Sequence, residues 1–131
     1  MSPYTGILIS NISNVTIQGD GRIGHFARGV LVNNSKNVYI LNLNFSGNEV
    51  SIKVINSSGI SITDNYLFTN TVGIKFYNVN NSVVLTNFLD SNDIAAISLF
   101  ESYDNIISNN LISTSLNGIF IDDKSDNITI S

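Results

Sequence analysis

Few side chains in this sequence are suited to acid–base or metal chemistry. The 131 residues include one histidine, His25, one methionine and no cysteine. Copper sites in proteins are built from His, Met and Cys side chains, so this set does not predict a copper site. Glycoside hydrolysis needs two carboxyl groups at a fixed separation, and the only adjacent acidic pair is Asp122 and Asp123. Because this pair is far from His25 in the chain, no catalytic residue is predicted.

Four acidic residues near the C-terminus form two pairs with the same separation. Asp123 follows Glu101 in the chain by the same interval at which Asp126 follows Asp104. If this separation is one structural repeat, the carboxylates of each pair lie opposite each other, where like charges repel. A bound Ca²⁺, which takes oxygen ligands, would relieve that repulsion. The four residues are therefore a candidate calcium site, with a solvated acidic edge as the alternative, and no other cofactor is predicted.

Lysine and aromatic residues recur with a similar spacing in the second half of the chain. Lys75 follows Lys53 by this same interval, and Phe100 follows Tyr77 by an interval one residue longer. These residues and Phe120 alternate with apolar positions, so on β-strands they point away from the core. Exposed aromatic rings beside positive charge are typical of surfaces that bind sugars. We therefore expect the five side chains to bind a polysaccharide or another glycan, unless a further segment of a larger protein covers this face.

The elements that position these residues follow from an internal repeat with a period of about 22 residues. Each repeat has a small residue followed by apolar residues one and three positions later. The small residues are Gly6, Gly29, Ser51, Gly73, Ala96 and Gly118. The alternation and the abundance of Ile and Val predict short strands, and no segment has a helical pattern. One coil cannot bury its apolar face, but stacked coils share a core.

The sequence thus predicts one all-β domain over residues 1–131, a right-handed, single-stranded parallel β-helix of about six coils. Its apolar residues form four columns, and the first two begin at Ile7 and Ile9. The other two columns are Ile17, Ile40, Ile62, Val84 and Ile107, and Ile23, Phe45, Leu67, Leu89 and Ile112.

Asparagine is abundant and forms columns of its own. One column is Asn11, Asn34, Asn56 and Asn78, and two more are Asn48, Asn70, Asn92 and Asn65, Asn87, Asn110. Asn tolerates positive φ in turns, and stacked Asn side chains can bond from one coil to the next. A leucine-rich repeat has a similar period, but the scarcity of Leu and the absence of helical segments disfavour it.

Two segments resemble the repeats of a known family. DNIISNNLIS, which starts at Asp104, and SSGISITDNYLF, which starts at Ser57, resemble right-handed parallel β-helix repeats of the NosD-like and carbohydrate-binding or sugar-hydrolase type. The resemblance covers nearly the whole chain. It implies the fold and an extracellular, cell-surface or periplasmic location, although residues 1–10 lack the features of a signal peptide. Members include polysaccharide lyases, hydrolases, adhesins, surface-layer proteins and copper-maturation factors, so the fold alone does not assign a function.

The composition excludes two classes of partner. Only 12% of the residues are charged and the net charge is −4, whereas nucleic-acid binding needs clustered Lys and Arg. No apolar run approaches the length of a membrane span. We interpret the sequence as a non-catalytic cell-surface or secreted module that binds carbohydrate or has a structural role. We also interpret it as a fragment of a longer solenoid whose uncapped coils self-associate end to end. Part of a polysaccharide lyase or glycoside hydrolase, and a NosD-like maturation or accessory protein, are the alternatives.

Overall fold

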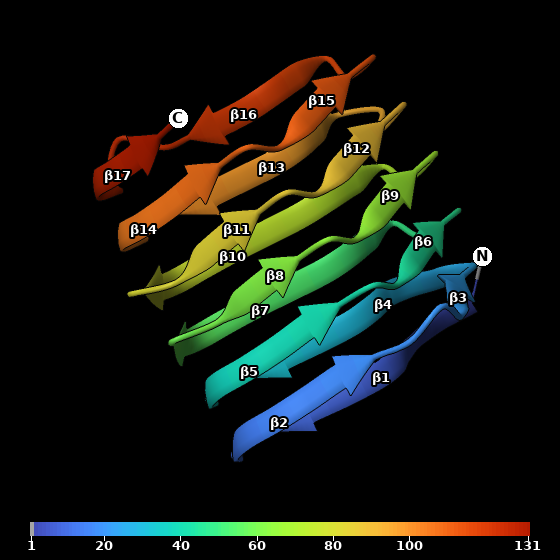
Figure 1. Cartoon of the computed structure of the whole chain (residues 1–131), viewed down its shortest axis with the longest axis horizontal. Helices are drawn as coiled ribbons and strands as arrows, with labels where there is room; N and C mark the ends of the chain where they lie inside the picture. Colours follow the sequence, from blue (N-terminus) through green and yellow to red (C-terminus); the bar gives the residue numbers. More distant parts are fainter. Residues whose placement is uncertain (1) are drawn as a thin grey trace.

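The computed structural model describes residues 2–131, which form a parallel β-solenoid of about six turns. Figure 1 shows the coils stacked from the N-terminal coil, in blue, to the C-terminal coil, in red. The predicted fold class is therefore confirmed. These residues form no helix, and so no helix long and apolar enough to cross a membrane.

The strands form three series, of which one lies on one side of the stacked coils and two lie on the other (Figure 1). The strands of the first series reach nine residues and are here called the long strands. The long strands are β1 (Ser2–Ser10), β4 (Phe26–Asn33), β7 (Val50–Ser58), β10 (Val72–Asn80), β13 (Ala95–Phe100) and β16 (Asn117–Ile121). The second series is β2 (Ser13–Gln18), β5 (Lys36–Leu41), β8 (Ser61–Thr63), β11 (Val83–Leu85), β14 (Tyr103–Ser108) and β17 (Asp126–Ile130). The third series is β3 (Arg22–Gly24), β6 (Asn44–Ser46), β9 (Tyr66–Phe68), β12 (Phe88–Asp90) and β15 (Leu111–Ser113).

The strands of successive coils pair in the predicted register. In the long strands Ile52 lies between Val30 and Ile74, and all three side chains are fully buried. The third and fourth apolar columns also align, with Ile62 beside Val84 and Phe45 beside Leu67. At the two ends the same columns are only partly buried, as at Ile7, Ile23, Ile112, Ile119 and Ile121, because a neighbouring coil covers them on one side only.

The column of small residues makes room for large side chains from the opposite strands. A Cβ atom added to Gly73 would lie 3.0 Å from Leu89 Cδ2 and 2.5 Å from the carbonyl oxygen of Ala96. A Cβ atom added to Gly29 would lie 3.1 Å from Phe45 Cδ1. The small residues therefore allow the long strands to approach the third series closely enough to close the core.

Residues with positive φ recur at the corners of the coils. They include the predicted turn residues Asn34, Asn56 and Asn78, with φ of 46°, 49° and 52°. Other corners contain β-branched residues, such as Thr69 and Thr86, in the same left-handed conformation. Threonine is unfavourable there, so the sequence alone did not identify those corners.

The two internal asparagine columns form the predicted ladders. Asn48 Nδ2 donates to Asn70 Oδ1 at 3.2 Å, and Asn70 Nδ2 donates to Asn92 Oδ1 at 3.0 Å. Asn65 and Asn87 repeat the arrangement at 3.1 Å. These amides also bond the backbone of neighbouring coils, so the buried polar groups of the turns are satisfied.

Candidate functional site

The predicted ligand-binding residues lie together on the outward face of the long strands. Lys75 of β10 pairs in register with Lys53 of β7, and Tyr77 pairs with Phe100 of β13. Phe120 of β16 follows one coil later, opposite Ser98. The alternation of the strands turns all five side chains away from the buried columns at Ile52, Val54, Ile74 and Phe76, as the sequence predicted.

Direct contacts link three of these side chains. The ammonium of Lys75 lies 5.0 Å from the centroid of the Phe100 ring, within cation–π range. The Phe100 and Phe120 rings are tilted by 38° with centroids 5.4 Å apart. The three side chains line a mainly apolar groove of about 290 Å³, together with Val72, Ile94, Ala95, Ser98 and Asn117. This groove offers ring faces and one cation to a ligand.

The positive charge on this face is unfavourable for the free protein. The pKa of Lys53 is lowered from its usual value, first by partial burial and then by the charges of Lys75 and Arg28. Glu49 opposes this shift only in part. An anion held between the lysines would remove the repulsion.

One of the two predicted acidic pairs near the C-terminus, Asp104 and Asp126, is not stacked. Tyr103 pairs with Asp126, so Asp104 lies one coil below Asn127 rather than below Asp126. The Asn127 amide accordingly donates a hydrogen bond to the Asp104 carboxylate. The register prediction for this pair is wrong because the last coil accommodates one extra residue. Leu99 still pairs with Ile121 at the regular interval, whereas the interval from Tyr103 to its partner Asp126 is one residue longer.

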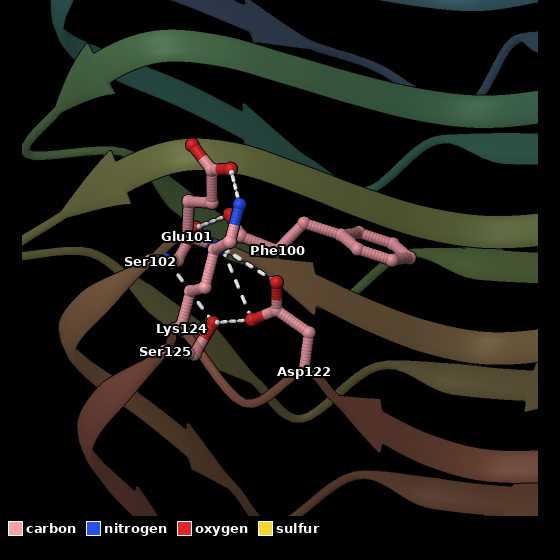
Figure 2. Close-up of polar contacts among 6 residues, drawn as sticks. All are labelled: Phe100, Glu101, Ser102, Asp122, Lys124 and Ser125. Atoms are coloured by element: carbon pink, nitrogen blue, oxygen red, sulfur yellow. Dashed lines mark hydrogen bonds and ion pairs between the residues drawn. The ribbon is translucent and has the colours of Figure 1, made fainter.

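The extra residue lies in a turn at 122–125, shown in Figure 2. There the Asp122 carboxylate accepts the backbone N–H of Glu101 at 3.1 Å and the Ser125 hydroxyl at 2.6 Å. The Glu101 carboxylate forms an ion pair with Lys124 at 2.9 Å. Within residues 2–131, no three His, Cys, Asp or Glu side chains converge as a metal-binding group, so Glu101, Asp104, Asp123 and Asp126 do not form a ligand set in this structure.

A second, polar groove was not found by sequence reasoning. It has a volume of about 420 Å³ and follows the corner between the long strands and the second series. Its lining consists of Asn34, Ser35, Lys36, Asn56, Ser57, Ser58, Asn78, Asn80 and Tyr103. The asparagine column indicated the corner. The aligned positions Lys36, Ser58, Asn80 and Tyr103 differ in residue type, so they gave no repeat signal in the sequence.

Comparison with protein families gives a match over the whole chain. The model of the family described as "Periplasmic copper-binding protein (NosD)" matches residues 1–131. The chain belongs to the NosD family. This membership agrees with the parallel β-helix and supports the predicted extracellular or periplasmic location. A search of the curated proteins found no match.

The residues of this NosD-family chain do not fit a copper centre. Copper sites need several His, Met or Cys donors, and the described part of the chain offers His25 alone. Nε2 of His25 lies 3.5 Å from Nη2 of Arg22, whose positive charge disfavours a cation there. No copper ligand set is therefore present among residues 2–131.

Proposed function

We propose that this NosD-family chain is a non-catalytic periplasmic or extracellular module that binds an acidic polysaccharide along the outward face of its long strands. The observation that carries the proposal is the groove of about 290 Å³ in which Lys75 lies over the ring of Phe100 and Phe120 packs against that ring. Lys53 lies one coil before Lys75 on the same face.

The arrangement suits a sugar chain that lies along the solenoid axis. Successive coils are about 4.8 Å apart, which is similar to the length of a sugar ring. Successive rings would meet Lys53, Lys75 and the two phenylalanines in turn. The aromatic faces provide apolar contact for the C–H faces of the sugar, and Tyr77, which is 42% exposed, extends this surface.

Charge favours an acidic ligand over a neutral one. Partial burial lowers the pKa of Lys53, and repulsion from Lys75 and Arg28 lowers it further. A carboxylate or sulfate group between the two lysines would offset this repulsion. Because exposed charges are screened over about 10 Å at 0.1 M salt, the affinity should fall as salt is added.

The test is a binding screen with polygalacturonate, alginate and hyaluronan as acidic polysaccharides and with dextran and xylan as neutral ones. The proposal expects salt-sensitive binding of at least one acidic polysaccharide that is strongly weakened in the double variant Lys53→Ala/Lys75→Ala. Phe120→Ala should weaken binding without changing its dependence on salt.

Arg22→Ala is the control, since Arg22 is an exposed cation of β3 that lines neither this groove nor the other one. It should leave the affinity for the acidic polysaccharide nearly unchanged. If no acidic polysaccharide binds, or if Arg22→Ala weakens binding as much as a single change at Lys75, the proposal fails and a structural role is favoured.

A further inference from the structure

We propose that the polar corner groove is a second binding site, which takes a neutral, hydroxyl-rich oligosaccharide lying along the solenoid axis. This site differs from the lysine and aromatic face in both location and chemistry. The two grooves share no lining residue. Either one can therefore bind its ligand without the other.

The groove presents a continuous row of polar side chains from four successive coils. Lys36 pairs in register with Ser58, Ser58 with Asn80, and Asn80 with Tyr103. The coils are about 4.8 Å apart, so each step of the row corresponds to about one sugar ring. Two polar groups of this row have no hydrogen-bond partner within residues 2–131. They are the Ser58 hydroxyl and the Lys36 ammonium.

Tyr103 forms one end of the groove, and its hydroxyl group is held in place by the protein. Its hydroxyl oxygen accepts a hydrogen bond from Asn80 Nδ2 at 2.8 Å, which fixes the position of the oxygen. The hydroxyl proton remains available for a ligand, because a phenol both donates and accepts. The ring, which is 43% exposed, provides an apolar wall beside these polar groups. Carbohydrate sites combine these two features.

The outer asparagine ladder is interrupted in the middle of the groove. Asn34 Nδ2 donates to Asn11 Oδ1 at 2.6 Å, and Asn78 Nδ2 donates to Asn56 Oδ1 at 2.8 Å. Between these two bonds, Asn34 Oδ1 and Asn56 Nδ2 have no partner in the described part of the chain. Both residues are exposed and line the groove.

The interruption leaves one acceptor and one donor on adjacent coils. A hydroxyl group can accept from Asn56 Nδ2 and donate to Asn34 Oδ1 at the same time, whereas a carboxylate can only accept. This pair therefore selects for alcohols. Together with Ser58 and Tyr103 it forms a row of neutral donors and acceptors that hydroxyl groups can satisfy, with Lys36 as the one charged group of the lining.

The test uses the whole chain, labelled with ¹⁵N, in a titration with maltotetraose, cellotetraose, xylotetraose and chitotetraose, and with glucose as the monosaccharide control. The proposal expects saturable shifts of the amide signals around Asn56, Ser58 and Tyr103 with at least one tetrasaccharide, and weaker binding of glucose. The variant Asn56→Asp replaces the free donor with a charged acceptor, while Asp still accepts from Asn78 and tolerates the positive φ. It should raise Kd about 2- to 10-fold, the effect of one net hydrogen bond.

Asn14→Asp is the matched control, because Asn14 also has positive φ and also accepts from the Asn of the next coil, but lies outside the groove. Its Kd should equal that of the wild type. Ser58→Ala provides a second variant if Asn56→Asp does not fold. The proposal is overturned if no tetrasaccharide gives saturable shifts, or if the shifts cluster around Lys75 and Phe120. It is also overturned if neither groove variant changes Kd. Binding of acidic polysaccharide on the other face would survive all of these results.

Discussion

The carboxylate of Asp122 takes the place of a backbone carbonyl for the N–H group of Glu101. In earlier coils the corresponding N–H bonds a main-chain oxygen one coil away, as Asn34 does with Ile55 at 3.1 Å. In the last coil the turn at 122–125 displaces the main chain, and Asp122 Oδ1 accepts the Glu101 N–H at 3.1 Å instead (Figure 2). One side chain thus preserves the ladder where the repeat length changes.

The hydrogen bond that Asp122 accepts from Glu101 predicts a pH-dependent contribution to stability. Desolvation raises the pKa of Asp122, but hydrogen bonds from the Ser125 hydroxyl and from the backbone of Glu101, Lys124 and Ser125 outweigh it, so that the pKa falls below 3.8. A carboxyl group with a lowered folded-state pKa stabilises the fold above about pH 3.8 and loses this effect as the pH falls through the folded-state value. Asp122→Asn should therefore be less stable than the wild type at pH 7, with the difference shrinking below pH 3.8. Urea unfolding over this pH range measures it, and a constant difference would contradict the assignment.

The buried asparagine ladder should be essential for stability. Asn87 Oδ1 accepts the backbone N–H and the side-chain amide of Asn65, and its own amide donates to Ile62. Asn87→Ala would leave these buried groups unsatisfied and should cost about 3 kcal/mol of unfolding free energy. Asn117→Ala is the control, since Asn117 is exposed and makes one long hydrogen bond of 3.4 Å. Denaturant unfolding should show a change within about 0.5 kcal/mol for this control. Equal effects of the two variants would argue against the ladder.

Two glycines of the same column should respond differently to a methyl group. A Cβ atom on Gly73 would lie 2.5 Å from the Ala96 carbonyl oxygen, so Gly73→Ala should destabilise the protein by about 1–3 kcal/mol through overpacking. At Gly118 the nearest atom, Ile112 Cγ2, would lie 3.6 Å away. Gly118→Ala should therefore be neutral or stabilise by up to about 1 kcal/mol. Thermal and urea unfolding of both variants check the prediction, which the reverse order would contradict.

Metal titrations should give no specific site. His25 is the one histidine, and the Asp104 carboxylate bonds Asn127 while Glu101 pairs with Lys124. Cu⁺, Cu²⁺ and Ca²⁺ are therefore expected to leave the melting temperature unchanged, because a ligand that binds the folded state would raise it. A rise with copper that His25→Ala abolishes would reveal a site at His25. A rise with Ca²⁺ that Asp104→Asn abolishes would support a calcium site at Asp104.

The first and last coils should make the isolated chain self-associate. Strands β1 and β16 each pair with one long strand only, and exposed apolar residues such as Ile12 and Ile130 lie on the terminal coils. Unpaired strand edges add further strands readily. Sedimentation velocity should show oligomers that grow with concentration, and Ile12→Lys/Ile130→Lys should reduce them. A monomer at all concentrations would contradict this prediction.

The sequence by itself determined the repeat and therefore the core. A strand has a side-chain period of two, so the spacing that places Val30, Ile52 and Ile74 inside also places Lys53 and Lys75 outside. The asparagine columns followed from the same spacing, since Asn is suited both to positive φ and to stacking. These features are periodic, and periodicity can be detected without coordinates.

Only the tertiary structure decided the features that depart from the repeat. Because of one extra residue at 122–125, Asp104 lies opposite Asn127 rather than opposite Asp126. A turn can contain an additional residue without any change in the neighbouring strands. No hydrogen bond joins the side chains of Asn34 and Asn56, although the neighbouring pairs of the same residue type are bonded, so residue type does not specify the interruption. The corner groove brings together Lys36, Ser58 and Tyr103, whose side chains share no chemical type. Stacking coils fixes which positions become neighbours, but the hydrogen bonds that form or remain open depend on local geometry.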